Sequence, residues 1–288
     1  MKAIYKRELK SYFDSMTGYV FIAFVTAFIG IYFLAYNMYN GYPYFSRALG
    51  SITIIMLLAV PVLTMKSFAE ERKTRTDQML LTAPVSLTQI VLGKYFAMMT
   101  IFAVPMLFSC LCPLIIRANG NAYFLTDYSS ILAFYLMSGV FIAIGMFISS
   151  LTESQIISAV GTFAAMLVLY LWDSLMSFLP TSAVGTVAGL VVIITAFALI
   201  VYSATKNWLA AAFVEVLGIV ITAVLYVTKK SLFTNGLGSL LSNININNGF
   251  ENFAYNNIFD VTGLIAYISA IFVFIFLTVQ SLSKRRWS

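Results

Sequence analysis

The chain contains eight apolar runs, each long enough to cross a lipid bilayer, at about residues 17–37, 48–66, 91–116, 129–151, 156–178, 184–205, 208–228 and 261–282. Crossing the hydrocarbon core takes roughly 20 apolar residues in a helix. The composition agrees, because 61% of the residues are hydrophobic and only 10% are charged. We therefore expect an all-α polytopic membrane protein with eight spans, and a single transmembrane domain over residues 1–288.

The distribution of Lys and Arg predicts the orientation of these spans. With the N-terminus inside, the inner segments carry most of the 17 basic residues, namely Lys2, Lys6, Arg7, Lys10, Lys66, Arg72, Lys73, Arg75, Lys94, Lys206, Lys284, Arg285 and Arg286. The outer segments then carry only Arg47, Arg117, Lys229 and Lys230. This asymmetry follows the positive-inside rule, so both termini are expected in the cytoplasm. The alternative is that 184–205 and 208–228 do not both cross fully.

Residues 66–89 form a charged segment between the second and third runs, KSFAEERKTRTDQMLLTAPVSLTQ. Its first half is too rich in charge to enter the bilayer, so we expect it in water. Pro84 ends a helix-permissive stretch, and Ser86 with Gln89 has the spacing of a capping box that starts the next helix. A short helix is marginal in water by itself, so this one is expected to dock on a partner.

Two further segments are expected to lie outside the spans. Residues 2–14 are amphipathic and suit a helix in the membrane interface, with a solvated lead-in helix as the alternative. Residues 229–260 form the one long connection, which the proposed topology puts outside, and its apolar residues recur at helical spacing.

Asp173 and Glu215 are the only acidic residues inside the apolar runs. Ionisable groups inside a membrane suggest a translocation path. The alternatives are a structural pair or an inner water-filled vestibule for Glu215, and contact with the membrane interface for Asp173. An ion-coupled carrier or channel that uses Glu215 is therefore a second hypothesis for the function.

The residue types needed for chemistry are missing from the sequence. It has no histidine, no phosphate-binding glycine loop and no nucleophile with an activating partner. Cys110 and Cys112 are two apart in an apolar run, which is typical of inert packing residues. We expect no catalytic residue, cofactor or metal in this chain and no nucleic-acid partner; ATP, if used, binds to another subunit.

The charged segment resembles the permease subunits of ABC-2-type transporters. The pattern is an acidic-basic pair, a threonine, two leucines and a proline, followed by a Gly-Lys pair at the third span. Here these residues are Glu71-Arg72, Thr76, Leu80-Leu81, Pro84 and Gly93-Lys94. REL-x-SYF at 7–13, GYVF at 18–21 and the C-terminal stretch 250–287 are similar to gliding-motility-type permeases.

The resemblance implies an elbow helix at 2–14, a coupling helix at 66–83, and an outer loop at 229–260 that forms part of an extracellular lid. Its implied ATPase-coupling residues are Phe68, Glu70, Glu71, Arg72, Thr76, Leu80, Leu81 and Pro84. The implied partners are two copies of a separate ABC ATPase with ATP and Mg, a second permease copy or paralogue, and an accessory membrane protein with an outer domain. The implied location is the bacterial cytoplasmic membrane. Six spans are common in this superfamily and are the alternative to eight.

Overall fold

The computed structural model describes residues 1–76, 85–178 and 245–287, and, within 179–244, only Ser182, Ala198, Trp208, Ala212, Thr222, Tyr226 and residues 185–192, 194–195 and 215–220. The described residues form helices and turns, without a strand among them. The chain divides into a first unit, Met1–Tyr170 with Ile246–Ser288, and a second unit, Leu171–Asn245. The all-α prediction is confirmed for the described part of the chain.

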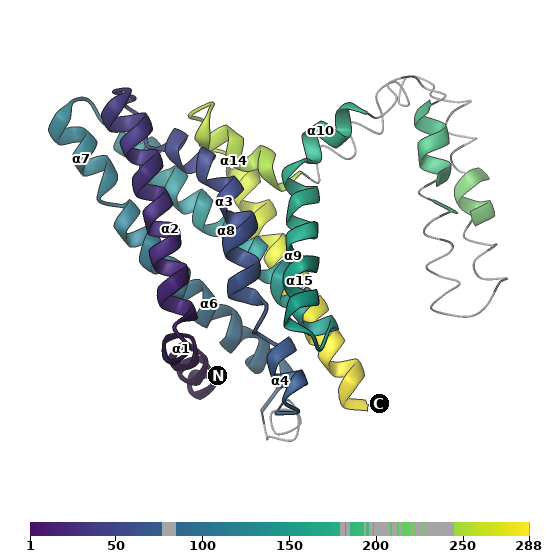
Figure 1. Ribbon diagram of the computed structural model, residues 1–288. Helices are drawn as coiled ribbons and strands as arrows, with labels where there is room; N and C mark the ends of the chain where they lie inside the picture. Colours follow the sequence, from purple (N-terminus) through teal and green to yellow (C-terminus); the bar gives the residue numbers. More distant parts are fainter. Residues whose placement is uncertain are drawn as a thin grey trace. The chain divides into compact units, whose positions relative to one another are not determined.

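The first unit contains the long helices (Figure 1). Its elements are α1 (Lys2–Asp14), α2 (Thr17–Phe33), the π-helical turn η1 (Leu34–Tyr39), α3 (Ser46–Thr64), α4 (Ala69–Lys73), α6 (Leu87–Ser109), α7 (Cys112–Asn119), α8 (Phe124–Leu151), α9 (Gln155–Tyr170), α14 (Ile246–Ala254) and α15 (Val261–Trp287). In the second unit, α10 (Trp172–Ser177) is the helix that follows α9.

Five helical stretches are long and apolar enough to cross a membrane: Thr17–Tyr39, Ser46–Lys73, Leu87–Asn119, Phe124–Leu151 and Val261–Lys284. They coincide with five of the eight apolar runs, which makes the chain a multi-pass membrane protein. Only about half of the residues in the runs at 184–205 and 208–228 are described, so the count of eight spans stays a prediction.

Two of the predicted spans are interrupted. The run at 156–178 is divided between α9 and α10, which meet at Leu171. Trp172 and Asp173 follow this break, and an aromatic residue beside a charged one is typical of a membrane interface, where a span ends. The run at 91–116 is divided between α6 and α7. Pro113 has no backbone N–H to donate within a continuous helix, but it lies in the first turn of α7, where no such hydrogen bond is needed.

Helix α8 forms the centre of the first unit. It packs against α3, α6, α9, α14 and α15. Of its most apolar window, 72% is buried inside the protein, whereas the corresponding value for α15 is 17%. Phe134, Met137 and Val140 of α8 are completely buried. Helix α15 is therefore a peripheral helix with a broad apolar surface turned outward.

Two side chains of α8 cap other helices. At one end, the Asp127 carboxylate accepts a hydrogen bond from the Phe45 amide, 2.8 Å away, at the start of α3. At the other end, the Ser149 hydroxyl accepts from the amides of Phe68 and Ala69, both at 3.1 Å, at the start of α4. Helix N-termini leave such amides without a partner inside the helix, so α8 supplies it at both places.

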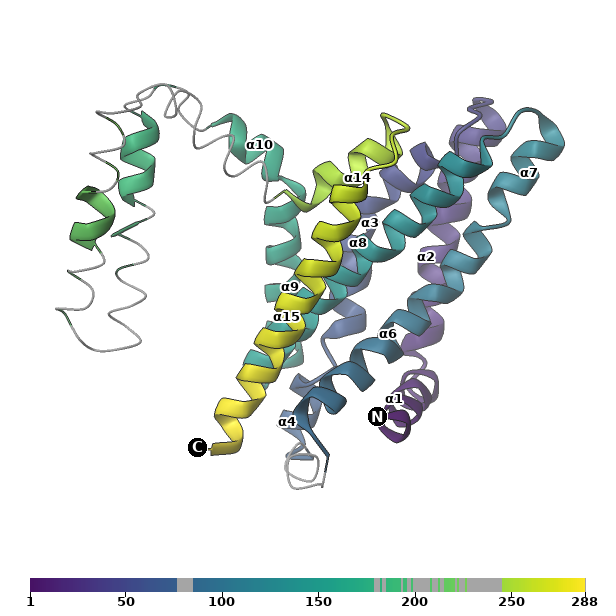
Figure 2. The same cartoon turned by 180° about the vertical axis from the view of Figure 1, so that it is seen from behind.

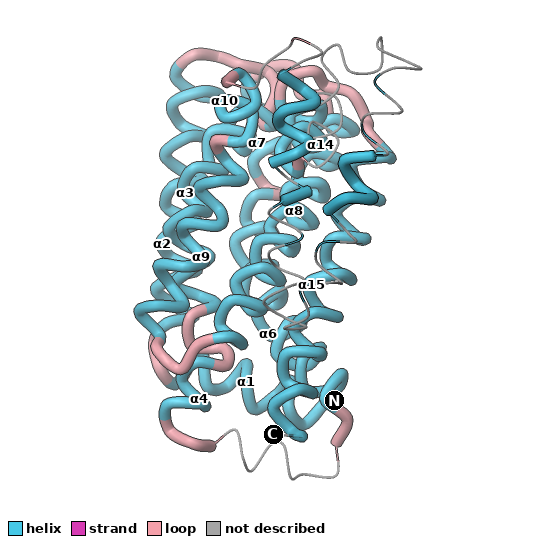
Figure 3. Tube along the Cα trace, turned by 90° about the vertical axis from the view of Figure 1, so that its right-hand side faces the viewer, coloured by secondary structure: helices cyan, strands magenta, loops and turns pink. Residues whose placement is uncertain are grey.

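The two chain termini and the charged segment lie at the same end of the first unit, while α7 and α14 lie at the other (Figures 1 and 2). The same grouping is visible after a quarter turn (Figure 3). Helix α1 lies across the lower end of α2, nearly end-on in Figure 1. This arrangement agrees with the predicted grouping of the basic segments on one side.

The first unit is interrupted in the sequence between the end of α9 and the start of α14. The Asn247 side chain at the start of α14 donates to the Leu169 carbonyl near the end of α9, at 2.8 Å. The chain therefore leaves and re-enters the first unit at nearly the same place. If the shorter apolar helix α9 is counted as a sixth crossing, none or two further crossings between these points satisfy this geometry, so six and eight spans are both compatible with it.

Candidate functional site

The charged segment leaves α3 through a turn and forms the short helix α4. Ser149 of α8 holds the start of this helix, since its hydroxyl also donates to the Met65 carbonyl at 3.3 Å. Arg75, in a left-handed conformation with φ 58°, follows the end of α4. Residues 66–76 of the segment are thus fastened to the bundle through α8.

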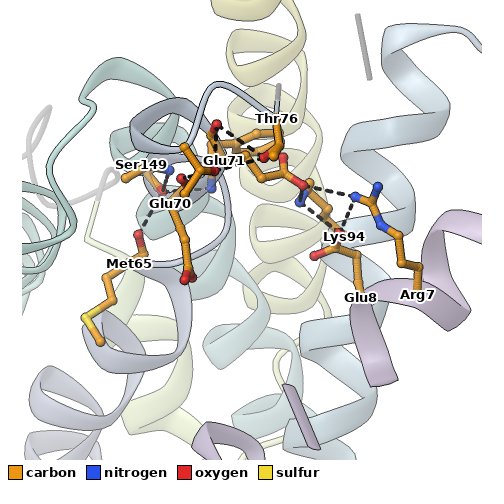
Figure 4. Close-up of polar contacts among 11 residues, drawn as sticks. Arg7, Glu8, Met65, Glu70, Glu71, Thr76, Lys94 and Ser149 are labelled. Carbon is orange, nitrogen blue, oxygen red and sulfur yellow. Dashed lines mark hydrogen bonds and ion pairs between the residues drawn. The ribbon is translucent and has the colours of Figure 1, made fainter. Parts of the chain in front are cut away.

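Four charged side chains from three helices meet beside α4 (Figure 4). We call Arg7, Glu8, Glu71 and Lys94 the four-charge cluster. The Arg7 guanidinium lies 2.8 Å from Glu8 Oε1 and 2.9 Å from Glu71 Oε1. The Lys94 ammonium lies 3.0 Å from each of the same two oxygens. Each cation therefore contacts both carboxylates, and the contacts form a closed ring.

Because the four-charge cluster is partly buried, separating its charges costs free energy. The Lys94 side chain is 2% exposed and the Glu71 side chain 17%, whereas Arg7 is 53% exposed. The Lys94 ammonium also lies 5.2 Å from the ring centre of Phe68. A lysine this deeply buried needs opposite charge nearby, because the desolvation of an unpaired ammonium is costly. Two cations and two carboxylates leave the cluster formally neutral, which satisfies this requirement.

The cluster joins α1, α4 and α6, and further contacts attach α1 to the bundle. The Tyr12 hydroxyl donates to the Leu63 carbonyl of α3 at 3.0 Å, and burial raises the pKa of this phenol, which keeps the donor protonated. The hydroxyls of Tyr5 and Thr100 are 3.0 Å apart. Helix α1 is therefore mechanically linked to the charged segment through α6 and α3.

The Gly93-Lys94 pair has a clear structural role. A Cβ on Gly93 would lie 3.1 Å from Ile4 Cγ2, so the glycine lets α1 approach α6 closely. The neighbouring Lys94 then reaches the two carboxylates of α1 and α4. Gly93 thus permits the close approach of α1 to α6, and Lys94 supplies the charge that binds the carboxylates of α1 and α4.

The predicted coupling residues of α4 divide into an inner and an outer group. Phe68 and Arg72 are buried, and Glu71 points into the four-charge cluster. Of the predicted coupling residues, Thr76 is exposed, as are its neighbours Lys73, Thr74 and Arg75, which were not predicted as coupling residues. Glu70 is half-buried, and its carbonyl accepts from the Thr74 hydroxyl at 2.9 Å. Leu80, Leu81 and Pro84 lie outside the described residues.

The predicted start of the third span is confirmed. Ser86 is the N-cap of α6, and its hydroxyl accepts from the Gln89 amide at 3.3 Å. The expected contact of Gln89 back to Ser86 through its side chain is not among the hydrogen bonds of the described residues.

Sequence reasoning did not find Arg7, Glu8 and Lys94 as members of this site. A signal was present for Lys94, because it is a lone charge within an apolar run. Such isolated charges require partners, but their identity depends on which helices pack together.

The predicted path residues Asp173 and Glu215 belong to the second unit, not to the unit that holds the four-charge cluster. The Asn245 side chain donates to the Asp173 carboxylate at 2.7 Å. The Thr195 hydroxyl lies 3.5 Å from the Glu215 carboxylate. Each acid thus has a neutral polar partner, which fits the structural alternative for Glu215, while the translocation path stays an untested expectation.

No group of three or more His, Cys, Asp or Glu residues that could hold a metal occurs among the described residues. Cys110 is half-buried and Cys112 is buried, and both are free thiols.

Residues 35–170 match the profile of a protein family described as ABC-2 family transporter protein. The match begins in η1, ends with α9 and contains Glu71 and Lys94, and it spans just under half of the chain. No curated protein and no solved structure matched the chain. Together with the apolar helices, the match supports a membrane-embedded permease component of an ABC-2-type transporter.

Proposed function

We propose that this chain is the permease subunit of an ATP-driven exporter, coupled through its charged segment to a separate ATPase subunit. The observation that carries the proposal is the four-charge cluster, which joins this segment to α1 and α6 at the end of the bundle that holds both termini. Such a connection can transmit a movement of the segment into the bundle. The match of residues 35–170 to an ABC-2 transporter family supports the same function.

In this mechanism the chain itself performs no chemistry. Two copies of the ATPase bind ATP and Mg and change their separation, and the segment 66–83 follows as the coupling helix. Its exposed residues Lys73, Thr74, Arg75 and Thr76 form the surface that contacts the ATPase. The cluster then passes the displacement to α6 and α1, and the ATPase thereby shifts the balance between two arrangements of the bundle.

The assembly proposed here contains a second permease copy or paralogue and an accessory membrane protein with an outer domain, set in the bacterial cytoplasmic membrane with both termini inside. Helix α1 acts as the elbow helix. The sequence similarity at 7–13, 18–21 and 250–287 favours a member of the gliding-motility type. An ion-coupled carrier based on Glu215 is the less favoured function, because the family match is to ABC transporters and Glu215 lies outside it.

The test uses exposed residues, so that the fold is preserved. In the variant Lys73→Glu/Arg75→Glu, copurification of the ATPase subunit with the tagged permease should fall strongly, since both positions lie on the projecting surface. A matched control is Arg117→Glu, which reverses an exposed charge in the last turn of α7, at the opposite end of the bundle. Its copurification should equal that of the parent protein.

Membrane insertion is measured in parallel for all variants. Equal recovery of the ATPase with the Lys73/Arg75 variant and the control, at equal insertion, would contradict the proposed contact surface. Recovery of transport by the purified chain without any ATPase would contradict the proposed function as a whole.

A further inference from the structure

An apolar groove of about 570 Å³ runs along the first unit between α6, α8 and α15. Tyr95 and Met99 lie on its floor and are 4% and 6% exposed. Phe272 and Phe276 of α15 lie on its rim and are 71% and 60% exposed. The groove is thus a shaped hollow with an open side, and its volume falls in the range of roughly 300–1,000 Å³ typical of small-molecule sites.

The groove offers its occupant hardly any free polar groups. The Tyr95 hydroxyl donates to the Gly139 carbonyl at 3.3 Å, and the Tyr135 hydroxyl donates to the Met99 carbonyl at 3.2 Å. Both phenols therefore use their protons inside the protein, and their rings face the groove as apolar surface. An occupant of this groove must itself be apolar over the buried part of its length.

The length of the groove matches one leaflet of a bilayer. Along α6 it extends from Thr88 to Met99, about 17 Å at roughly 1.5 Å per residue. The hydrocarbon core of a bilayer is about 30 Å thick, so one leaflet accounts for roughly 15 Å. Thr88 lies in the first turn of α6, so the groove occupies the half of the bundle next to the charged segment.

Positive charge lies beyond the same end of the groove. Val279 is the last lining residue on α15, and the exposed Lys284 follows it a little over one turn later. The sequence then adds Arg285 and Arg286. Basic clusters directly beyond a membrane helix attract anionic lipid headgroups.

We infer that this groove binds one acyl chain of an anionic phospholipid, whose headgroup lies beside the basic end of α15. A lipid is favoured over a second copy of the chain because the groove is apolar, has the length of one leaflet and has basic residues beyond one end. The inference concerns a lipid site and is independent of the proposed ATPase coupling.

The experiment uses the purified full-length chain in nanodiscs that contain a trace of phosphatidylglycerol with a photoreactive acyl chain. The comparison probe is phosphatidylcholine with the same acyl chain. After illumination, labelled peptides are mapped by mass spectrometry. We expect phosphatidylglycerol to label residues 88–99 and 271–279 several-fold more than phosphatidylcholine does.

Two variants test the two parts of the site. Leu136→Trp fills the groove from α8 and should reduce labelling by both lipids, whereas Ile31→Trp, on an exposed face of α2, should not. Neutralisation of Lys284, Arg285 and Arg286 to Gln should lower labelling by phosphatidylglycerol to the level of phosphatidylcholine. Size-exclusion profiles verify that each variant is folded.

Equal labelling by the two lipids, unchanged by Leu136→Trp, would overturn the inference and assign the groove to bulk lipid. A second test uses Phe272→Cys in a chain whose Cys110 and Cys112 are replaced by Ser. If neither lipid labels the groove and two chains cross-link efficiently through this cysteine, the groove binds a second copy of the chain and the lipid inference is overturned.

Discussion

The ammonium of Lys94, in the third apolar run, lies 3.0 Å from the carboxylate of Glu71 in the charged segment, and this lysine is almost completely buried. The pair joins helix α4 to helix α6. Glu8 and Arg7 extend the pair to the N-terminal helix α1. A displacement of α4 must therefore either move α1 and α6 with it or break contacts between buried charges.

Replacement of Lys94 by Met should destabilise the protein strongly. It removes the cation that neutralises Glu8 and Glu71 and leaves Arg7 alone with two carboxylates. Removal of one partner of a buried ion pair costs about 3–5 kcal/mol. Denaturant titration in mixed micelles would measure this change in the free energy of unfolding.

The double variant Lys94→Met/Glu71→Leu provides the control for that prediction. It removes one charge of each sign, so it should cost clearly less than the sum of the two single changes. Lys73→Met, at an exposed position, should have little effect. Additive costs at Lys94 and Glu71 would show that the two charges are not energetically coupled.

Ser149→Ala should loosen the charged segment without disturbing the bundle. The change leaves the amides of Phe68 and Ala69 without their side-chain acceptor, and loss of an N-cap acceptor typically costs about 1 kcal/mol. Trypsin should then cleave after Lys73 or Arg75 several-fold faster, which peptide mapping of digested protein would detect. Ser150→Ala is the matched control, because the Ser150 hydroxyl donates within its own helix, to the Phe147 carbonyl. Equal cleavage rates in the two variants would contradict the capping role.

Gly145→Ala should disturb the packing of α3, α8 and α9. A Cβ at this position would collide with Thr64 Oγ1 and lie 2.9 Å from Thr162 Cγ2, and overpacking of a dense interface costs roughly 1–3 kcal/mol. Gly30→Ala, whose Cβ would meet no atom within 4 Å, should be nearly neutral. Melting temperatures in detergent compare the two variants, and a similar loss for both would argue against a close approach at Gly145.

Asp260 should make the start of α15 sensitive to acid. Its carboxylate accepts hydrogen bonds from the side chains of Thr262 and Asn252 and from the Gly263 amide, and these donors lower its pKa. In the unfolded chain the pKa of Asp260 is about 3.9, and above this pH the charged carboxylate contributes its full stability to the folded state. This contribution is lost as the pH falls through the lower pKa of Asp260 in the folded state.

The variant Asp260→Asn mimics the protonated residue, so it measures this contribution. The parent protein should melt at a higher temperature than the variant from pH 7 down to about pH 4, and the difference should disappear at lower pH. A difference that stays constant below pH 3 would show that the charge of Asp260 does not stabilise the fold.

The membrane class, the positions of the long helices and the N-cap at Ser86 were predictable from the sequence, because they depend on local properties. A run of apolar residues must be buried in lipid or protein wherever it lies, and a serine at the right spacing caps the helix that follows it. The division of the run at 156–178 was less predictable, since periodicity does not reveal where an apolar helix ends at an interface.

The partners of the isolated charges were decided only by the tertiary structure. Lys94 was visible in the sequence as a charge in unfavourable surroundings, but the sequence did not show that Glu8 and Glu71, the latter an expected ATPase-coupling residue, both contact it. The capping of α4 by Ser149, 80 residues away in the chain, was equally invisible. The sequence alone determines that a charge needs a counter-charge, because desolvation acts on each residue locally. Which counter-charge it finds depends on how the helices pack, and this packing brings α1, α4 and α6 together at one point.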